Sequence, residues 1–207
     1  MPKITNERYK NFIKTGVIKL FEMDELDKGL KIAGLSKFGK EARAFLIIIY
    51  YTGARPIELL QLKASNFKKD KNDLEIQIPT AKNGRPRMVS IPFARKYVKE
   101  LYDYVNSFMP DILVFYDLIS RKERKYTKKN GETIIYIVIT DKIYYYMTKW
   151  IGLNPYFFRH NRMSSLAQNG LDLIDLQQFK GAKRVDSVMP YLHMSKNIAK
   201  KIGRKIK

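Results

Sequence analysis

The stretch LEIQIPTAKNGRPRMVSIP, residues 74–92, constrains the fold more than any other part of the chain. Leu74, Ile76 and Ile78 alternate with polar residues, which is the spacing of a β-strand with one apolar face. The pair Asn83–Gly84 follows, which is typical of a tight hairpin turn, and apolar residues resume on its far side. The stretch therefore predicts a β-hairpin.

Helical periodicity dominates the rest of the chain. EARAFLIIIYYTGA, residues 41–54, predicts a buried helix that ends near Gly53, and proline in Arg55–Pro56 suits the first turn of the next helix. A further helix is expected from Pro155 to about Gln168, and a short one from Asp172 to Lys180 that is closed by a glycine. The predicted fold class is mostly α with a small antiparallel β-sheet or hairpin (α+β).

Three segments between these elements complete the prediction. A long helix is expected from about Phe93 to Phe108. The polar stretch SRKERKYTKKNGE, residues 120–132, predicts a loose loop, and IIYIVI at 134–139 predicts a strand. No internal repeat or change in composition divides the sequence, so a single domain is expected.

The charge of the chain indicates its partners. Lysine and arginine number 40 and aspartate and glutamate 20, which gives a formal charge of +20. Such an excess attracts polyanions, above all the closely spaced phosphates of nucleic acid. A membrane surface is a weaker alternative, because no long basic amphipathic helix stands apart from the rest. The hydrophobic fraction of 45% provides enough apolar surface for a packed core.

Several classes of site are excluded by what the sequence lacks. With no cysteine there can be no disulfide, thiolate zinc site or cysteine nucleophile. The only histidines are His160 and His193, too few for a histidine-rich metal site. No segment resembles a membrane span or a signal peptide, so a cytoplasmic protein without membrane association is expected.

Two basic constellations precede the middle of the chain. Arg55 and Glu58 lie three residues apart at a helix start, where they can pair and where backbone N–H groups favour phosphate. An ordinary surface ion pair explains the same spacing. Lys82 is at the tip of the predicted hairpin, with Arg85 and Arg87 beside it, and could enter a DNA groove. The alternative is a solvated turn lysine.

A third constellation lies in YFFRHNRMSSLAQNGLDLIDLQQFKG, residues 156–181. Two predicted helices meet at an Asn-Gly turn, and Arg159, His160 and Arg162 cluster in the first. One interpretation is a helix-turn-helix that reads DNA. Another is a catalytic arginine supported by Tyr156, and a third is an ordinary packed helix pair.

The fourth is the stretch around Tyr191. A basic run, Lys183–Arg184, is followed by Ser187 as the expected cap of a short helix that contains Tyr191 and His193. The chain has 14 tyrosines, and a helical tyrosine is far more often buried than nucleophilic. Taken alone, Tyr191 is therefore expected to pack.

The order of these four parts resembles the catalytic domain of the tyrosine recombinases, the phage-type integrases and Xer-like recombinases. TGARPIEL is similar to the first-arginine box, KNGRPRMVSIP to the lysine-bearing hairpin and FRHNRMSSLAQNG to the second-arginine box. Tyr191 follows position 182 by nine residues, the distance from the third box to the nucleophile, and YLH matches Tyr-x-His. The resemblance implies that the catalytic residues are Arg55, Lys82, Arg159, His160 and Tyr191.

Two positions depart from the family pattern. The second box usually begins with histidine, but here that position is Tyr156, whose hydroxyl could still bind a phosphate oxygen. The third box usually has histidine or tryptophan after its glycine, but here Ala182 is followed by Lys183. This pattern resembles divergent archaeal members from viruses or plasmids.

The resemblance also implies a mechanism and partners. A 3′-phosphotyrosyl link conserves bond energy, so no cofactor, metal or ATP is expected. Double-stranded DNA is the expected substrate, bound by a tetramer, with an N-terminal DNA-clamping domain that this sequence does not include. Residues expected to support DNA binding are Glu58, Arg85, Arg87, Arg162, Lys183, Arg184 and His193.

The resemblance covers residues 22–195 and so predicts a division of the chain. Residues 1–21 would be a basic lead-in, 22–195 the catalytic domain and 196–207 a basic tail. Two alternatives remain for the function. One is a type IB topoisomerase-like nicking-closing enzyme, and the other is a non-catalytic helix-turn-helix-like DNA-binding protein.

Overall fold

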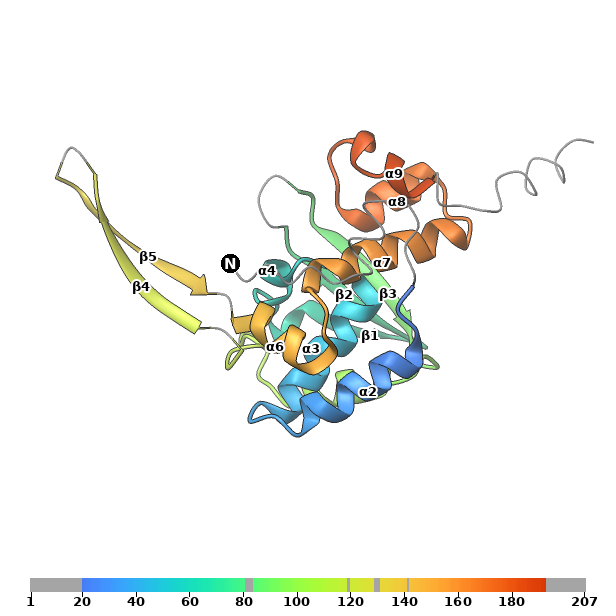
Figure 1. The fold of residues 1–207 in the computed structure, drawn as a ribbon, viewed down its shortest axis with the longest axis horizontal. Coiled ribbons are helices and arrows are strands. Elements are labelled where there is room, and N and C mark those ends of the chain that lie inside the picture. Colours follow the sequence, from blue (N-terminus) through green and yellow to red (C-terminus); the bar gives the residue numbers. More distant parts are fainter. Residues whose placement is uncertain (1–19, 81–83, 119, 129–130, 141, 193–207) are drawn as a thin grey trace, which may run out of the picture.

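A computed structural model describes residues 20–80, 84–118, 120–128, 131–140 and 142–192. Figure 1 shows a helical body, a small sheet against it, and a long two-stranded ribbon that projects away. The elements in chain order are α2 (Met23–Gly34), α3 (Gly39–Thr52), α4 (Pro56–Leu59), η1 (Ala64–Asn66), β1 (Phe67–Asp70), β2 (Asp73–Ile78), β3 (Arg87–Pro92), α5 (Val98–Val105), β4 (Ser120–Thr127), β5 (Thr133–Thr140), α6 (Lys142–Ile151), α7 (Pro155–Gln168), α8 (Leu173–Lys180), η2 (Val185–Ser187) and α9 (Met189–Leu192).

Helix α3 forms the centre of the core. Its run from Phe45 to Ile49 is buried on every side, because α2, α5 and α7 all pack against it. A helix that is apolar all round needs such complete cover. It ends as predicted at Gly53, which adopts φ +56° and donates its N–H to Ile49 O at 2.9 Å. This left-handed cap turns the chain directly into α4.

The predicted hairpin is confirmed. Strands β2 and β3 pair antiparallel, with Leu74 opposite Ile91 and Ile76 opposite Val89, and β1 extends the sheet in the order β1-β2-β3. These four side chains are buried, and their neighbours in β3 are exposed, so one face covers the core. Arg87 begins the buried row of β3 and is the one charged residue in that row.

The predicted fold class, mostly helical with small antiparallel sheets, is confirmed, but two elements differ from expectation. The prediction of a loose loop over residues 120–132 is wrong for Ser120–Thr127, which form β4 and pair with β5 along the whole ribbon. The polarity of this segment did not reveal the strand, because strand propensity depends strongly on the cross-strand neighbours. The helix expected from Phe93 to Phe108 is shorter, since α5 begins only after Tyr97, which adopts φ +67°.

The last helices form a second, smaller apolar cluster. Met163 and Ala167 of α7 pack with Leu176 of α8, Val188 and Tyr191. Helix α7 has the predicted bounds and Asn154 as its N-cap, whereas α8 begins one residue later than predicted, because Asp172 is its N-cap. The predicted cap at Ser187 is wrong, since its hydroxyl donates to Arg184 O at 2.9 Å and η2 precedes α9. Helix α7 thus faces both clusters and connects them.

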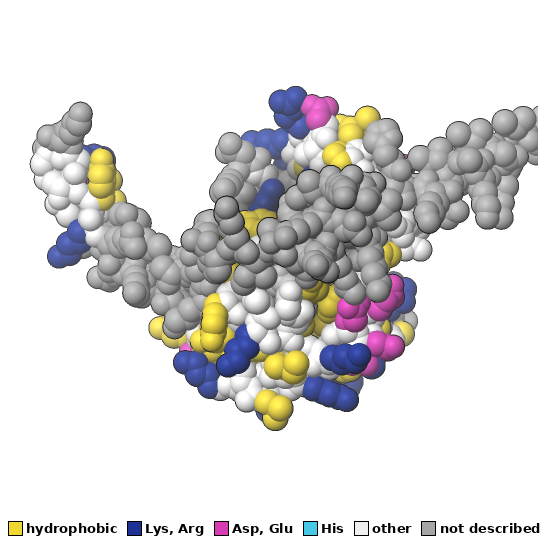
Figure 2. Space-filling view, viewed as in Figure 1, with side chains coloured by type: hydrophobic (Ala, Val, Ile, Leu, Met, Phe, Trp, Pro, Cys, Tyr) yellow, Lys and Arg dark blue, Asp and Glu magenta, His cyan; other side chains and the backbone are white. Residues whose placement is uncertain are grey.

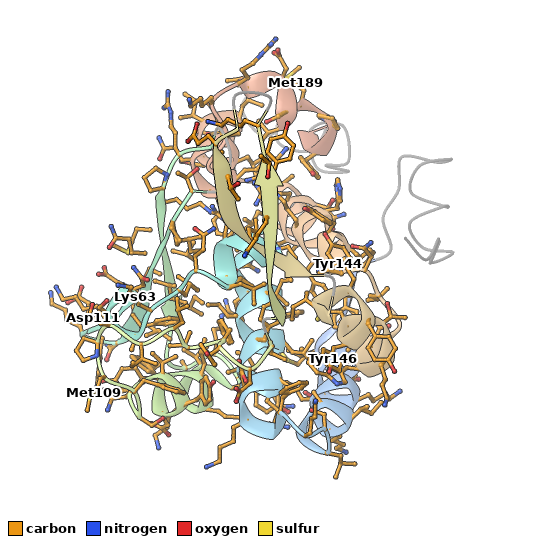
Figure 3. The ribbon with its side chains drawn as sticks, turned by 90° about the vertical axis from the view of Figure 1, so that its left-hand side faces the viewer. Lys63, Met109, Asp111, Tyr144, Tyr146 and Met189 are labelled. Atoms are coloured by element: carbon orange, nitrogen blue, oxygen red, sulfur yellow. The ribbon has the colours of Figure 1, made fainter. Side chains whose placement is uncertain are left out.

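The segment after α5 returns to the sheet end of the body. Lys63 bridges Leu113 through the backbone, and its ammonium lies 3.5 Å from Asp111 Oδ1. Figure 3 labels both residues on the same side of the molecule. Tyr144 and Tyr146 of α6 lie at the other side of that view. Within the described residues, no helix is both long and apolar enough to span a bilayer.

We predict that Gly53→Ala destabilises the fold more than the same substitution does at a left-handed glycine with open space around it. A Cβ at Gly53 would lie 2.9 Å from Arg162 Cβ and 3.3 Å from Arg159 Cα. The expected loss is about 1 kcal/mol for the backbone and a further ~1–3 kcal/mol for overpacking, measured by urea unfolding. The matched control is Gly152→Ala, which has φ +67° but open space around the added Cβ. Equal losses in the two variants would contradict this prediction.

Candidate active site

The carboxylate of Glu58 is the hub of a cluster of arginines. Glu58 is only 1% exposed, and its Oε1 lies 2.6 Å from Arg55 Nη1. Its Oε2 accepts the Arg55 N–H at 2.9 Å, which fixes the start of α4, where proline at the first position suits the turn. Arg55 itself is 28% exposed. The pair is therefore not the surface ion pair that the spacing alone would also allow.

Two more arginines converge on the same carboxylate. Arg87 of β3 donates from Nη2 to Glu58 Oε2 at 2.9 Å, and Arg159 Nη1 of α7 lies 3.8 Å from that oxygen. Burial raises the pKa of Glu58, but the attraction of Arg87 and the hydrogen bonds from Arg55 outweigh it, so the pKa lies below its usual value. Three cations share one anion, and the cluster keeps a positive excess.

The excess is costly in the free protein. Burial, with repulsion from Arg55 and Arg87, lowers the pKa of Arg159 to about 10. Within the described part of the chain, Nε and Nη1 of Arg87 are buried and have no hydrogen-bond partner. Buried donors without partners cost about 1–3 kcal/mol each and call for an explanation. An anionic oxygen placed among these groups would satisfy them.

The hairpin is joined to the C-terminal helices beside this cluster. Arg85 N–H donates to Gly181 O at 2.9 Å, and a Cβ at Gly181 would lie 2.7 Å from Arg85 O. Gly181 adopts φ +65° as the cap of α8, so both its conformation and its contact favour glycine. A hollow of about 510 Å³ lies between β3 and α8 at this junction. Lys82, three residues before Arg85, lies outside the described residues.

Tyr191 meets His160 directly. Its Oη lies 2.8 Å from His160 Nδ1, and the two rings are 5.9 Å apart and tilted by 39°. Burial, together with repulsion from Lys180 and Arg159, lowers the pKa of His160 below its ordinary 6.5. The imidazole is therefore neutral at pH 7, and a neutral ring can accept a proton from the phenol.

Arg159 and His160 are adjacent on α7, and the structure thus joins the arginine cluster to Tyr191. Arg159 also donates from Nη1 to Gly53 O at 3.3 Å and from Nη2 to Lys180 O at 2.5 Å. Its guanidinium is held from both α3 and α8. The structure brings together Arg55, Glu58, Arg87, Arg159, His160 and Tyr191 of the residues predicted from the sequence.

Lys180 was not among the predicted residues, yet it belongs to this group. Its ammonium lies 5.2 Å from the centre of the Tyr191 ring and donates to Ser187 O. Burial, with repulsion from Arg159 and Arg55, lowers its pKa to about 8. The one signal in the sequence is its place directly before the glycine that closes α8.

The remaining predicted residues lie around the cluster. Tyr156 is 39% exposed, with its ring 6.0 Å from that of Tyr144. Arg162 packs under Gly53 with its guanidinium 5.9 Å from the Phe179 ring. Burial lowers the pKa of Arg162. The exposed ones are Arg85, Lys183 and Arg184, and His193 lies outside the described residues.

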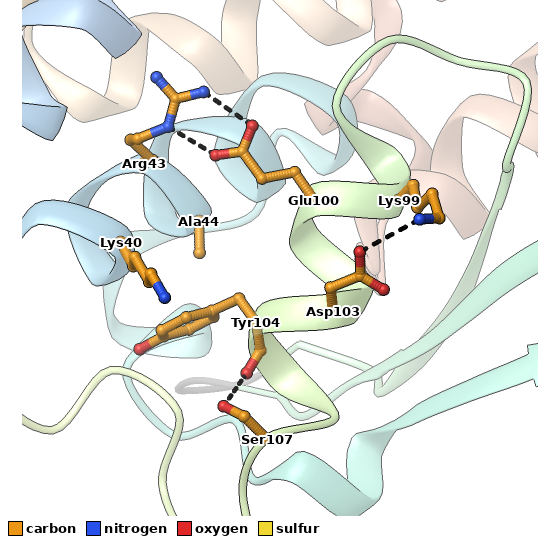
Figure 4. A pocket seen from close by; sticks show the side chains of 8 residues that line it. All are labelled: Lys40, Arg43, Ala44, Lys99, Glu100, Asp103, Tyr104 and Ser107. Carbon is orange, nitrogen blue, oxygen red and sulfur yellow. Dashed lines mark hydrogen bonds and ion pairs between the residues drawn. The ribbon is translucent and has the colours of Figure 1, made fainter.

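A second pocket, of about 630 Å³, opens between α3 and α5 (Figure 4). Its charged groups largely satisfy one another, since Arg43 holds Glu100 through two bonds of 2.5 and 2.7 Å. Lys99 lies 3.6 Å from Asp103. Burial raises the pKa of Tyr104, so its phenol is less acidic than usual. This pocket therefore lacks an activated group.

The described side chains on the face shown in Figure 2 do not form a second concentration of charge. Basic side chains are dispersed there, with acidic ones among them near α2 and beside the C-terminal helices. Among the residues that the structure describes, no three His, Asp or Glu side chains are grouped as metal ligands would be. Reactive groups and uncompensated charge coincide only at the junction of α4, β3, α7, α8 and α9 within this part of the chain.

Comparison with solved structures gives the class of this fold. A XerH site-specific recombinase bound to its difH substrate matches 91% of this chain and 54% of its own, at TM-score 0.59 and 20% identity. The catalytic domain of bacteriophage HP1 integrase matches 92% of this chain and 96% of its own, at TM-score 0.56 and 15% identity. The fold is that of a tyrosine recombinase catalytic domain.

Sequence comparison gives the family. The profile of the Phage integrase family matches residues 19–197. Tyrosine recombinase XerD of Rickettsia bellii is 25% identical over 81% of this chain, and XerC of Leptospira interrogans is 25% identical over 99%. The chain covers 56% and 61% of the lengths of these two relatives. The chain belongs to the phage integrase family.

We predict that Glu58→Gln lowers the free energy of unfolding by about 3 kcal/mol at pH 7, because three arginines lose their shared anion. The pKa of Glu58 is depressed in the folded state, so its stabilisation is present above the unfolded value near ~4.3 and is lost as pH falls further. Urea unfolding at pH 7 and pH 3 should therefore show a difference from wild type that shrinks in acid.

The control is Asp103→Asn, which breaks an exposed pair with Lys99 and should cost less than about 0.5 kcal/mol. A loss at Glu58 as small as that of the control would show that the arginines do not depend on the carboxylate.

Proposed function

We propose that this chain is the catalytic part of a site-specific DNA recombinase or integrase that cleaves and rejoins strands through Tyr191. The observation that carries the proposal is the 2.8 Å contact between Tyr191 Oη and His160 Nδ1, beside an arginine cluster with excess positive charge. A phenol, a neutral base and clustered guanidinium groups are the parts that phosphoryl transfer to tyrosine needs. Family membership supports the same conclusion.

The proposed cleavage step exchanges one phosphate ester for another. Tyr191 Oη forms a bond to the phosphorus of a DNA phosphodiester while the bond from phosphorus to the 5′-oxygen breaks. The phenolic proton passes to His160 Nδ1. The 5′-oxygen leaves with a proton from Lys82, the role that the family resemblance gives to this hairpin lysine. Strand joining is the reverse step with a different 5′-hydroxyl, and it needs no ATP because the ester energy is conserved.

The arginines would hold the phosphate. Arg55 is the most exposed of the three around Glu58 and is the natural entrance for a DNA strand. Arg159 and Arg87 lie deeper, and their charge would stabilise the additional negative charge of the five-coordinate transition state. Tyr156 is exposed near the start of α7, where its hydroxyl could donate to a phosphate oxygen. We assign no metal or other cofactor to this chemistry.

We infer that double-stranded DNA is the partner. The charge of +20 provides affinity that should fall steeply with salt, and a Tn1549 transposon integrase of similar fold was solved in complex with DNA. Arg85, Lys183 and Arg184 are exposed and are proposed phosphate contacts. Assembly as a tetramer on two duplexes, and a further N-terminal clamping domain, belong to this proposal. Tyr156 and Ala182 support an origin in an archaeal virus or plasmid.

We predict that Tyr191→Phe abolishes covalent trapping on a nicked suicide duplex and leaves salt-sensitive DNA binding intact. The variant removes only the attacking oxygen, since the ring still fills the apolar cluster. The measurement is a protease-sensitive DNA adduct on a denaturing gel, with the modified residue mapped by mass spectrometry. Tyr145→Phe, at an exposed tyrosine of α6, is the matched control and should trap like wild type.

The same assay separates the alternatives. If wild type forms no adduct with any target, the chain is a DNA-binding protein and the proposal is wrong. If an adduct forms, recombination between two sites identifies a recombinase. Relaxation of one supercoiled circle without exchange would identify a topoisomerase-like enzyme instead.

We predict that His160→Asn slows adduct formation about 10²-fold, because amide oxygen can accept the hydrogen bond of Tyr191 but cannot take its proton. Wild-type rate should fall in acid as His160 becomes protonated, with a midpoint below 6.5 in the free protein because burial lowers the pKa. The variant should lack this acid limb. A wild-type rate and an unchanged pH profile in the variant would rule out His160 as the base.

A further inference from the structure

The position of Lys180 is not explained by packing or by pairing with an acid. Lys180 ends α8, and its ammonium turns back over the ring of Tyr191 at 5.2 Å from the ring centre. It donates a hydrogen bond to the carbonyl of Ser187, four residues before Tyr191. In the described part of the chain it forms no ion pair with a carboxylate. Its own carbonyl accepts the 2.5 Å bond from Arg159.

The surroundings of this ammonium are cationic from several elements. Arg55 of α4 and Arg159 of α7 both repel it, and Lys180 in turn repels His160. From α9 it faces the π-face of Tyr191, to which a cation is attracted. The ammonium of a half-buried lysine ordinarily pairs with a carboxylate or extends into water. The ammonium of Lys180 instead lies near Arg55 and Arg159, the arginines proposed to bind phosphate.

We propose that Lys180 is a positioning and charge-supplying residue for strand transfer, which holds the chain before Tyr191 and stabilises the negative charge of its attacking oxygen. The inference rests on the proposed function. The side chain of Ala182, two residues further on, has no hydrogen-bond donor, and Lys183 and Arg184 are exposed, so Lys180 is the cation of this stretch that faces Tyr191.

The chemistry follows from the charge of each state. When the phenol gives its proton to His160, negative charge develops on Oη, and a cation near the ring lowers the energy of that state. As the Oη–phosphorus bond forms, the same cation faces the phosphate with Arg55 and Arg159. Lys180 must be protonated for both effects. Its low pKa of about 8 in the free protein makes this requirement visible as a loss of rate in alkali when the duplex is below saturation, where the pKa values of the free protein govern the rate.

The test uses the full chain and the suicide-duplex trap, with single-turnover rates measured from pH 6 to pH 10. Lys180→Met keeps the length of the side chain and removes the charge, and Lys180→Arg keeps the charge across this range. The control is Lys99→Met, which lowers the net charge equally at an exposed site on α5. DNA binding and urea midpoints are measured for all three.

We expect Lys180→Met to slow adduct formation by about 10-fold to 100-fold at pH 7, in the range of a lost electrostatic donor. Its stability should stay near that of wild type, because the relief of repulsion among cations offsets the lost contacts with Ser187 O and the Tyr191 ring. Lys180→Arg should retain most of the rate and shift the alkaline limb to higher pH. Lys99→Met should trap like wild type.

The inference is overturned if wild type traps DNA and Lys180→Met traps it at the same rate. It is also overturned if Lys180→Arg shows the alkaline limb of wild type, a result that does not depend on how Lys180→Met folds. Failure of wild type to form an adduct would remove the proposed function and this inference with it. The first two results would leave the proposed function standing.

Discussion

The buried carboxylate of Glu58 is the interaction on which the site depends. It joins Arg55 at the start of α4, Arg87 at the start of β3 and Arg159 in α7, three elements that local packing alone would not align. One anion cannot balance three guanidinium groups, and the excess of two positive charges remains in a largely dry space. That excess matches a phosphodiester that gains negative charge as it reacts, which a neutral network could not do.

The structure shows that packing and reactivity of Tyr191 are not exclusive alternatives. Tyr191 is 3% exposed and closes the apolar cluster with Val188 and Leu176, so it packs, as a helical tyrosine is expected to. Its hydroxyl nevertheless reaches His160 at 2.8 Å. The apolar ring of Tyr191 is therefore fixed by packing, while its hydroxyl extends to the site, as the amphipathic side chain of tyrosine allows.

Local signals determined how much could be predicted from the sequence. The cap at Gly53, the strands around Asn83–Gly84 and the bounds of α7 each depend on neighbouring residues, and all appear in the structure where they were predicted. The ribbon of β4 and β5 was missed because its pairing, not its composition, makes the basic segment a strand. Lys180 was missed for a related reason, since the group it faces is brought to it by a turn through Gly181 and η2.

The free protein bears costs at this site that DNA would relieve. Arg87 keeps two buried donors without partners, and both Arg159 and Lys180 have pKa values below those of free side chains. Each penalty comes from positive charge held out of water, so a phosphate oxygen would lower all three at once. If the site binds phosphate as proposed, linkage requires that binding raises the pKa values of both residues, and a ligand that binds only the folded state also stabilises it. The site therefore lowers the stability of the free protein, and the proposed phosphate ligand would offset that cost.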